Sequence, residues 1–509
     1  MLQARGFHPH FLMNPPASQL GRRMLNGTIW IFLAEALLLP TGILTAAFLT
    51  RQLGPEGYGL FTLAATLTAW IEWSVTSVFT RATIKFVGEA EDWRPVGATV
   101  LRLHLFMGGG VMLLVWLFAA LVGKLMGEPV LATYLRLFAL DIPLFCLGYA
   151  HRSILVGVGS FTQRAIATAG RWIARLVLIL VLVKMGLSVQ GAILGSVGAS
   201  LVELVISRFY IRPSLFGQST FPARKLWSYA VPLFLFALSM RLYEKLDLFA
   251  LKILGGTAAQ VGFYGAAQNL SLVPGIFSLS FSPLLLSTLS RTLYAGDTVL
   301  AQKISRDAMR AVIWMLPFAG MTAGAAPEIV SLLFGSAFLP TAPLLALLIF
   351  GAIALAMISI GTAILTAAGK PNWTFALAGP LLPLSIAGHI LLIPRLGAIG
   401  ASIVSTLFAS VGALATVVAV YCLWKVFPPV RTVWQSILIC GLAYALAAFW
   451  STDNFLLLFK LSVIALLIPL AFFLLGEFSH SEIALVRSLL GSIKRYSQKK
   501  ESNTSSAKN

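Results

Sequence analysis

The segment EALLLPTGILTAAFLTRQLGPEGYG, from Glu35 to Gly59, decides the fold because a similar segment recurs later in the chain. The second version runs from Arg241 to Gly265 and reads RLYEKLDLFALKILGGTAAQVGFYG. Both consist of an apolar helix end, a Leu-Gly step, a short polar turn and a Tyr-Gly pair. A fixed internal period of this kind predicts a repeated unit, and in a membrane transporter it is typical of two repeats around a central site.

Two further glycine pairs keep nearly the same spacing, so that the offset stays at about 206 to 210 residues throughout. Gly159 in LVGVGSF corresponds to Gly369 in LTAAGKP, and Gly191 corresponds to Gly400. Glycine is common in membrane helices, so each match alone is weak. Three matches in one frame favour an internal repeat over coincidence.

The composition indicates a protein with many transmembrane segments. Hydrophobic residues make up 58% of the 509 residues, charged residues make up only 11%, and the mean hydropathy is +0.88. Soluble domains carry about 25% charged residues. The three cysteines lie in apolar runs without a spaced pattern, so no disulfide framework is predicted.

Apolar runs long enough to span a bilayer recur along the chain, and about fourteen are expected. The predicted fold class is therefore an all-α polytopic membrane protein, with two pseudo-symmetric six-helix bundles and two C-terminal helices. The expected organisation is a cytoplasmic lead at 1–22, a six-helix bundle at 23–212, a cytoplasmic linker at 213–225, a second six-helix bundle at 226–425, two additional transmembrane helices at 426–477, and a basic amphipathic cytoplasmic tail at 478–509.

The net charge of +19 reflects membrane topology rather than a nucleic-acid surface. Lys and Arg concentrate in alternate loops, as at Arg22, Arg81, Arg152, Arg212 and Lys425. Because basic loops stay on the cytoplasmic side, both termini are predicted to be cytoplasmic. No partner of nucleic-acid type is expected.

Charged residues inside the predicted spans point to a functional cavity, since each costs at least about 2.5–3.5 kcal/mol near the bilayer centre. In the span at 164–185, Arg164, Arg171 and Arg175 fall on one helical face. Arginine stays charged and offers paired donors, so this face suits a phosphate-bearing headgroup. Snorkelling to the interface is the alternative for Arg164 and Arg171, and it is favoured for Arg164 at the helix end.

A second charged group lies in the repeated segment and includes Arg241, Glu244, Lys245 and Asp247. The repeat offset maps Arg241 onto Glu35, which predicts that these opposite charges help close the outer side of the site. An internally paired helix end is the structural alternative. The complete predicted set comprises the binding residues Arg171, Arg175, Arg241, Lys245, Arg81 and Arg136, and the gating or coupling residues Glu35, Glu72, Asp141, Glu244 and Asp247.

Nucleotide-binding and metal-binding signatures are absent from the sequence: there is no P-loop, HExxH, CxxC or dinucleotide fingerprint. No cofactor or metal is therefore predicted. Energy for transport is expected from an H+ or Na+ gradient, from the membrane potential or from the gradient of the substrate.

The stretch FLTRQLGPEGYGLFTLA, followed by RATIKFVGEAE, resembles the opening of bacterial O-antigen and exopolysaccharide flippases. These proteins belong to the multidrug/oligosaccharidyl-lipid/polysaccharide exporter superfamily. LDLFALKILGGTAAQVGFYGAAQNL resembles the start of that family's second half, and GKPNWTFALAG and GAIGASIVSTL resemble its eleventh and twelfth helices. Glu35 stands where the related peptidoglycan-precursor flippases are expected to carry arginines, which argues against that cargo.

The resemblance implies a flippase in the bacterial inner membrane that moves a polyprenyl-diphosphate-linked oligosaccharide to the outer leaflet by alternating access. Polysaccharide polymerase and chain-length proteins are implied as partners. A drug or cation antiporter of the same superfamily would share the fold but favour acidic cavity residues. A membrane-embedded polymerase or ligase would need a sizeable outer loop, and the longest expected loops are short and cytoplasmic.

Overall fold

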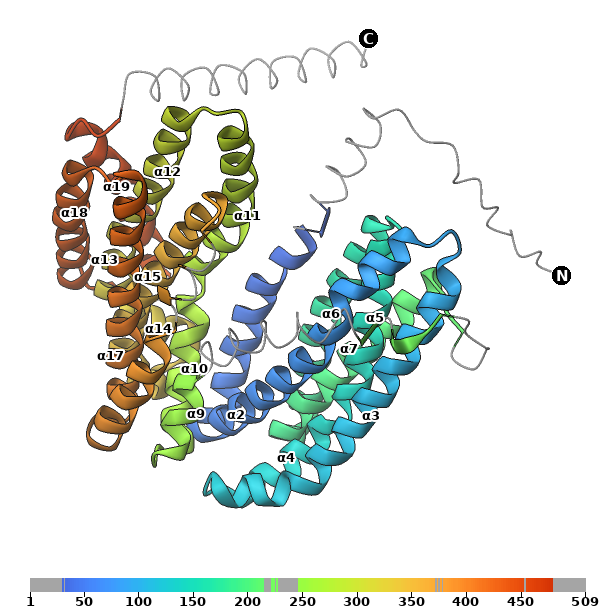
Figure 1. Ribbon diagram of the computed structural model, residues 1–509. Coiled ribbons are helices and arrows are strands. Elements are labelled where there is room, and N and C mark those ends of the chain that lie inside the picture. Colours follow the sequence, from blue (N-terminus) through green and yellow to red (C-terminus); the bar gives the residue numbers. More distant parts are fainter. Residues whose placement is uncertain are drawn as a thin grey trace, which may run out of the picture. The chain divides into compact units, whose positions relative to one another are not determined.

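The computed structural model covers all 509 residues and describes 30–31, 33–214, 221–224, 226–227, 246–370, 373, 376–377, 379–452 and 455–478. The regular elements in these ranges are helices (Figure 1), in agreement with the predicted all-α fold class. Helices are favoured because a backbone in lipid must satisfy its hydrogen bonds within the segment. Contacts between residues divide the chain into two units, residues 1–269 with 389–401, and residues 270–388 with 402–509.

Unit 1 is built mainly from helices that pack side by side around α5. Its elements are α2 (Leu38–Glu89), α3 (Trp93–Leu125), α4 (Pro129–Ala139), α5 (Asp141–Gly157), α6 (Phe161–Leu182), a π-helical turn (Val183–Leu187), α7 (Ser188–Tyr210), α9 (Leu246–Ile253) and most of α10 (Ala258–Ser271). Helix α5 contacts α2, α3 and α7, and α6 packs along α7. The charged residues considered below project from this group of helices.

The close approach of α2 and α10 assigns the start of the second repeat to unit 1. A Cβ atom on Gly59 would collide with the carbonyl oxygen of Ala258, and one on Gly262 would collide with that of Pro55. Only glycine allows two helix backbones to approach this closely. The segment expected to form the second bundle, 226–425, is consequently shared between the two units, with 246–269 and 389–401 in unit 1.

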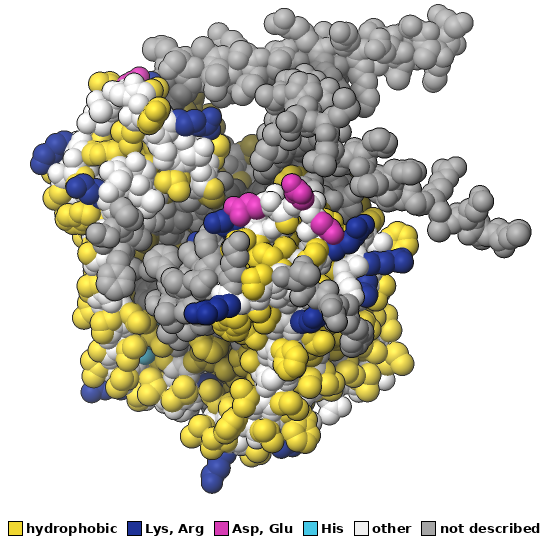
Figure 2. All heavy atoms as spheres, turned by 45° about the vertical axis from the view of Figure 1, so that its right-hand side comes forward, with side chains coloured by type: hydrophobic (Ala, Val, Ile, Leu, Met, Phe, Trp, Pro, Cys, Tyr) yellow, Lys and Arg dark blue, Asp and Glu magenta, His cyan; other side chains and the backbone are white. Residues whose placement is uncertain are grey.

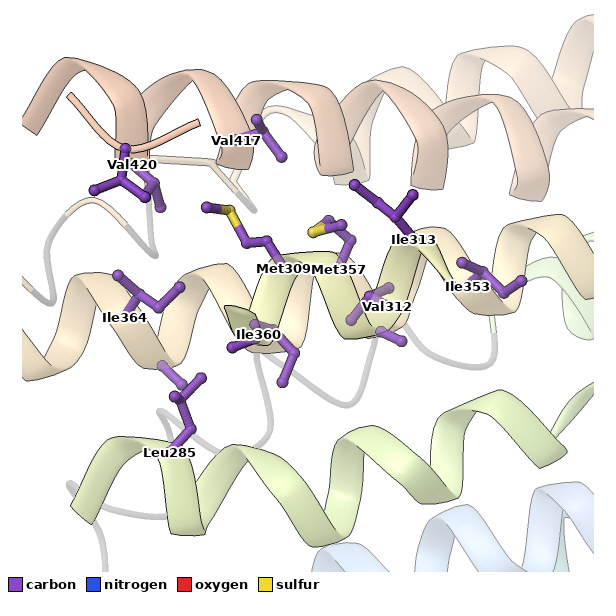
Figure 3. Packing of buried hydrophobic residues seen from close by; sticks show 14 of the residues in the cluster. Leu285, Met309, Val312, Ile313, Ile353, Met357, Ile360, Ile364, Val417 and Val420 are labelled. Carbon is purple, nitrogen blue, oxygen red and sulfur yellow. The ribbon is translucent and has the colours of Figure 1, made fainter. Parts of the chain in front are cut away.

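Unit 2 has an apolar centre. Its elements are α11 (Val273–Tyr294), α12 (Thr298–Ile313), α13 (Leu316–Gly324), α14 (Ala326–Phe334), a 3-10 turn (Ser336–Phe338), α15 (Thr341–Ala367), most of α17 (Leu381–Trp424), α18 (Val430–Phe449) and α19 (Leu456–Leu474). Figure 3 shows side chains such as Met309, Met357 and Ile360 meeting between these helices. Burial of this cluster holds α11, α12, α13, α15 and α17 together.

Two buried ion pairs attach the last two helices to the rest of unit 2. Lys460 of α19 is fully buried and pairs with Glu328 at the start of α14. Just after the C-terminal end of α19, Glu477 lies 2.8 Å from Arg310 of α12. A Cβ on Gly320 would collide with the carbonyl oxygen of Cys440, so α13 and α18 also lie in close contact.

Left-handed glycines at the helix junctions support the internal repeat. Four pairs in the described residues have positive φ and keep an offset of about 201 to 211 residues, namely Gly54 with Gly255, Gly127 with Gly335, Gly159 with Gly369, and Gly186 with Gly397. Glycine adopts this backbone conformation without the steric penalty of a side chain. The same turns therefore recur in both halves, as two pseudo-symmetric bundles require.

Within the described residues, eight helices are long and apolar enough to cross a membrane, or nine if one bent pair counts as a single span. Three of them reach 44 to 57 residues and turn sharply at Gly54, Gly186 or Gly397, so each is long enough for two crossings. The count of fourteen predicted from the sequence fits this arrangement. Figure 2 shows hydrophobic side chains over much of the visible surface, as expected for helices that face lipid.

Candidate functional site

Helix α6 carries the predicted arginine stripe. Arg164, Arg171 and Arg175 all lie within Phe161–Leu182, an unbroken helix, so their i, i+7 and i+11 spacing keeps them near one face. Arg164 lies at the first turn and Arg175 about 16 Å further along the axis at 1.5 Å per residue. The stripe therefore runs from the helix end into the interior of unit 1.

Glu203 of α7 lies between two arginines in the interior of unit 1. Its side chain is 0% exposed, its Oε1 lies 2.8 Å from Nε of Arg152, and its Oε2 lies 3.4 Å from Nε of Arg171. Arg152 is buried in α5, although the sequence pattern had placed it in a cytoplasmic loop. No periodicity in the sequence distinguished it from the neighbouring loop residues, and only the packing of α5 against α7 brings it to Glu203.

Two further buried carboxyl groups complete the charged cluster. Glu72 of α2 and Asp141 of α5 are 5% and 3% exposed. They interact electrostatically with each other and with Arg171 and Arg175. Together with the Glu203 group, the cluster contains three arginines and three carboxyl groups, namely Arg152, Arg171, Arg175, Glu72, Asp141 and Glu203. Its formal charge is balanced when every group is ionised.

A cavity of about 130 Å³ lies at the inner end of the arginine stripe. Its polar wall includes Tyr58, Trp172, Arg175 and Asn269, and the remaining lining residues are Leu38, Thr41, Gly42, Thr45, Ala46, Leu49 and Phe61. Nδ2 of Asn269 donates a hydrogen bond to Oη of Tyr58 at 2.9 Å. The lining thus combines polar groups from α2, α6 and α10 with apolar side chains of α2.

Two donors of this wall lack acceptors. Nε of Arg175 and Nε1 of Trp172 are both buried, and neither has a hydrogen-bond partner in the described part of the chain. Because a buried donor without an acceptor is unfavourable by about 1–3 kcal/mol, such a pair favours the entry of an acceptor-rich group. An anionic oxygen would satisfy both N–H groups and the guanidinium charge.

The other predicted residues are distributed differently. Glu35 pairs with Arg164 at 3.3 Å, and both side chains are partly exposed. Asp247 of α9 accepts hydrogen bonds from Tyr264 at 2.6 Å and Gln268 at 2.9 Å. Neither Glu35 nor Asp247 is among the residues that line the cavity in the described part of unit 1.

Arg81 and Arg136 also lie away from this cavity. Arg81 is exposed near the C-terminal end of α2. Arg136 is exposed on α4, where its guanidinium group stacks 5.1 Å from the ring centre of the exposed Trp116. Such stacking on an outer face explains an arginine in a span without a cavity. Arg241, Glu244 and Lys245 lie outside the described residues.

Among the described residues, no group of three or more His, Cys, Asp or Glu side chains is arranged to hold a metal ion. The cluster of unit 1 instead combines guanidinium groups with carboxyl groups. Guanidinium groups bind oxyanions, and carboxyl groups exchange protons. The site is therefore suited to recognising a phosphate or carboxylate on a ligand.

Slightly more than half of the chain matches the model of a known protein family. Residues 24–289 match the family model described as polysaccharide biosynthesis protein. A candidate O-antigen transporter of Shigella flexneri is 27% identical over 201 residues, which cover 37% of this chain and 47% of that relative. The chain thus spans about half the length of the curated relative it matches.

Solved structures of low sequence identity share the fold. The lipid II flippase MurJ in an inward closed conformation has a TM-score of 0.71 at 16% identity, covering 92% of this chain and 100% of that chain. An outward-facing multidrug resistance MATE family transporter has a TM-score of 0.56 at 14% identity, with coverages of 81% and 99%. A MOP superfamily transporter from Pyrococcus furiosus has a TM-score of 0.55 at 14% identity, also with coverages of 81% and 99%. The family match agrees with the predicted resemblance, and the solved structures show that the fold is shared.

Proposed function

We propose that this chain, which belongs to the polysaccharide biosynthesis protein family, is a flippase for a polyprenyl-diphosphate-linked oligosaccharide. The substrate would move from the inner to the outer leaflet of the bacterial cytoplasmic membrane. The observation that carries the proposal is made at the cavity lining. The buried N–H groups of Arg175 Nε and Trp172 Nε1 have no hydrogen-bond acceptor in the described residues. A diphosphate supplies both charge and acceptors.

The size of the cavity limits which part of the substrate it would receive. Pockets that enclose a drug-sized ligand measure about 300–1,000 Å³, whereas this cavity measures about 130 Å³. It is large enough for a phosphoryl group but not for an oligosaccharide. In this proposal Arg175 and Trp172 bind one phosphate, while the sugar and the prenyl chain lie outside the cavity.

The balanced charge of the cluster supports coupling to protons. A diphosphate that binds Arg175 competes with the carboxyl groups of Glu72 and Asp141 for the same positive charge. Two neighbouring buried carboxyl groups that lose a cation would take up a proton, because both cannot remain ionised at low cost. We therefore assign Glu72 and Asp141 to coupling, with H+ preferred over Na+ as the coupling ion.

Transport by this scheme requires alternating access, with the repeats moving relative to each other between two states. The predicted closing contact between Glu35 and Arg241 is part of this proposal. The location of both termini on the cytoplasmic side is part of it as well. In the described structure Glu35 pairs with Arg164 instead, so the contact with Arg241 would form in a different state. The polymerase and chain-length proteins remain proposed partners that would receive the product.

Transport in proteoliposomes tests the function. The purified full-length protein would be reconstituted with a fluorescent undecaprenyl-diphosphate-linked oligosaccharide, and access to an outside glycosidase would be followed with time. Protein-dependent loss of leaflet asymmetry is expected, and its acceleration by a pH gradient would support proton coupling. Absence of translocation, together with pH-driven efflux of a cationic dye from the same vesicles, would instead establish the drug or cation antiporter.

A further inference from the structure

Arg171 lies between a buried carboxylate and the residues that line the cavity. On one side, its Nε is 3.4 Å from the fully buried carboxylate of Glu203. On the other, Arg171 immediately precedes Trp172 and lies one helical turn before Arg175, two residues that line the cavity. Its side chain is 14% exposed, whereas that of Glu203 is 0% exposed. Arg171 is therefore the member of the Glu203 group that lies closest along the chain to the cavity wall.

We propose that Glu203 is an internal counter-ion that holds Arg171 until a diphosphate in the cavity displaces it. This inference rests on the proposed flippase function and adds a switching arginine to it. Arg152 would remain with Glu203 in both states, while Arg171 would exchange its partner. Glu203 is thus a positioning residue, which acts on the substrate through Arg171.

The two arginine contacts of Glu203 differ in a way that fits these roles. Arg152 lies 2.8 Å from Oε1, and Arg171 lies 3.4 Å from Oε2. Within the described residues, neither the Nε atoms of the two arginines nor the two carboxylate oxygens of Glu203 make a hydrogen bond of good geometry. The contact of Arg171 with Glu203 is the longer one. Because Coulomb attraction falls with distance, this ion pair is weaker than the shorter pair of Arg152 with Glu203.

Charge balance explains why the second arginine is available. One carboxylate neutralises one guanidinium group, so Glu203 offsets only one of the two arginines beside it. Glu72 and Asp141 balance the rest of the cluster and also interact with Arg171, so Arg171 does not depend on Glu203 alone. The centre of the Phe145 ring lies 4.5 Å from the guanidinium carbon of Arg171, and this aromatic surface stabilises the cation without neutralising it.

Competition for Arg171 links the two partners thermodynamically. If the diphosphate must displace Glu203, removing the Glu203 charge should strengthen diphosphate binding, because the displacement is no longer needed. This expectation is opposite to that for a glutamate with a purely structural role, whose loss would weaken binding or leave it unchanged. The sign of the effect therefore distinguishes the two roles.

The experiment measures binding of geranyl diphosphate to the full-length protein in lipid nanodiscs by isothermal titration calorimetry. Glu203→Gln should bind about tenfold more tightly than the native protein, within the 5- to 150-fold range of coupled sites. The double variant Glu203→Gln with Arg171→Ala should show no gain. Glu128→Gln is the matched control, because Glu128 also pairs with a cation, Lys252 at 2.8 Å, outside the cluster.

Unchanged or weaker binding by Glu203→Gln would overturn the switch. If Arg175→Ala still abolished binding in the same series, the cavity and the proposed function would stand without it. If the native protein bound no geranyl diphosphate, both the function and the switch would be rejected. Should Glu203→Gln fail to fold, Glu203→Asp is the second variant, because it retains the charge near Arg152 but shortens its reach to Arg171. A gain in affinity for geranyl diphosphate of about two- to fivefold is then expected. No gain in affinity would count against the switch.

Discussion

The charged centre of unit 1 and the apolar centre of unit 2 are filled differently, although both include helices that the repeat offset makes equivalent, such as α5 and α15. In unit 1, three arginines and three carboxyl groups lie among α2, α5, α6 and α7. In unit 2, the centre is the cluster of apolar side chains shown in Figure 3. With the repeat offset of about 209 residues, Asp141 corresponds to Phe350 and Glu203 to Gly412.

The difference shows that this helix arrangement does not require buried charge at its centre. Unit 2 achieves its packing with Leu, Ile, Val, Met and Ala. The ion pairs of Lys460 with Glu328 and of Arg310 with Glu477 attach its last two helices. A buried ion pair seldom stabilises a fold better than apolar residues of the same volume. Under the proposed function the charges of unit 1 serve a ligand, so substitutions in the two regions should have different consequences.

The largest expected effect is a loss of transport without a loss of folding in unit 1. Arg175→Ala should weaken binding of geranyl diphosphate by about a hundredfold or more, since truncating a buried charged partner costs about 2–5 kcal/mol. Transport in proteoliposomes should fall to the background rate. Arg136→Ala is the control, because this arginine is exposed beside Trp116 and away from the cavity. Equal activity of Arg175→Ala and the native protein would remove Arg175 from the site.

The opposite pattern is expected in unit 2. Ile360 is fully buried in the apolar cluster, so Ile360→Ala should destabilise the protein by about 2–5 kcal/mol through lost contacts and a cavity. Thermal unfolding in nanodiscs should show a lower midpoint, while the affinity for geranyl diphosphate stays unchanged. Leu355→Ala on the same helix is the matched control, because Leu355 is 48% exposed. A loss of affinity without destabilisation would break the distinction between the two regions.

The smallest expected effect concerns the contact between Asn269 and Tyr58 at the cavity wall. Asn269→Ala removes a hydrogen bond to Tyr58 worth about 0.5–1.5 kcal/mol, so binding of geranyl diphosphate should weaken about two- to tenfold. In a double-mutant cycle, Tyr58→Phe combined with Asn269→Ala should lose less than the sum of the single losses. Additive losses would indicate that the two side chains act on the ligand independently.

Much of the fold followed from local sequence. Long apolar runs required helices, and the recurring glycines at 159 and 369 proved to be left-handed residues of equivalent turns. The arginine face of α6 also followed from spacing alone, because a continuous helix keeps residues 164, 171 and 175 on one side. These inferences depend only on backbone geometry and solvent preference, which are properties of neighbouring residues.

The partners of the charged groups did not follow from spacing. Arg152 was assigned to a loop but is buried beside Glu203, while Arg136 was assigned to a cavity but stacks on an exposed tryptophan. Glu35 is paired with Arg164 in the structure, while its predicted contact with Arg241 lies outside the described residues. Each assignment depends on which helices are neighbours and on their rotation, and local periodicity contains neither.

The sequence alone therefore determined that this protein is a helical membrane protein with an internal repeat and arginines within its spans. Hydrophobicity and helical period operate over a few turns, so they can be read from residues in order. Only the tertiary structure decided which arginine lines a cavity, which one faces a carboxylate and which one lies on the outer surface. Coulomb energies and desolvation depend on distances between side chains from different helices, and packing alone sets those distances.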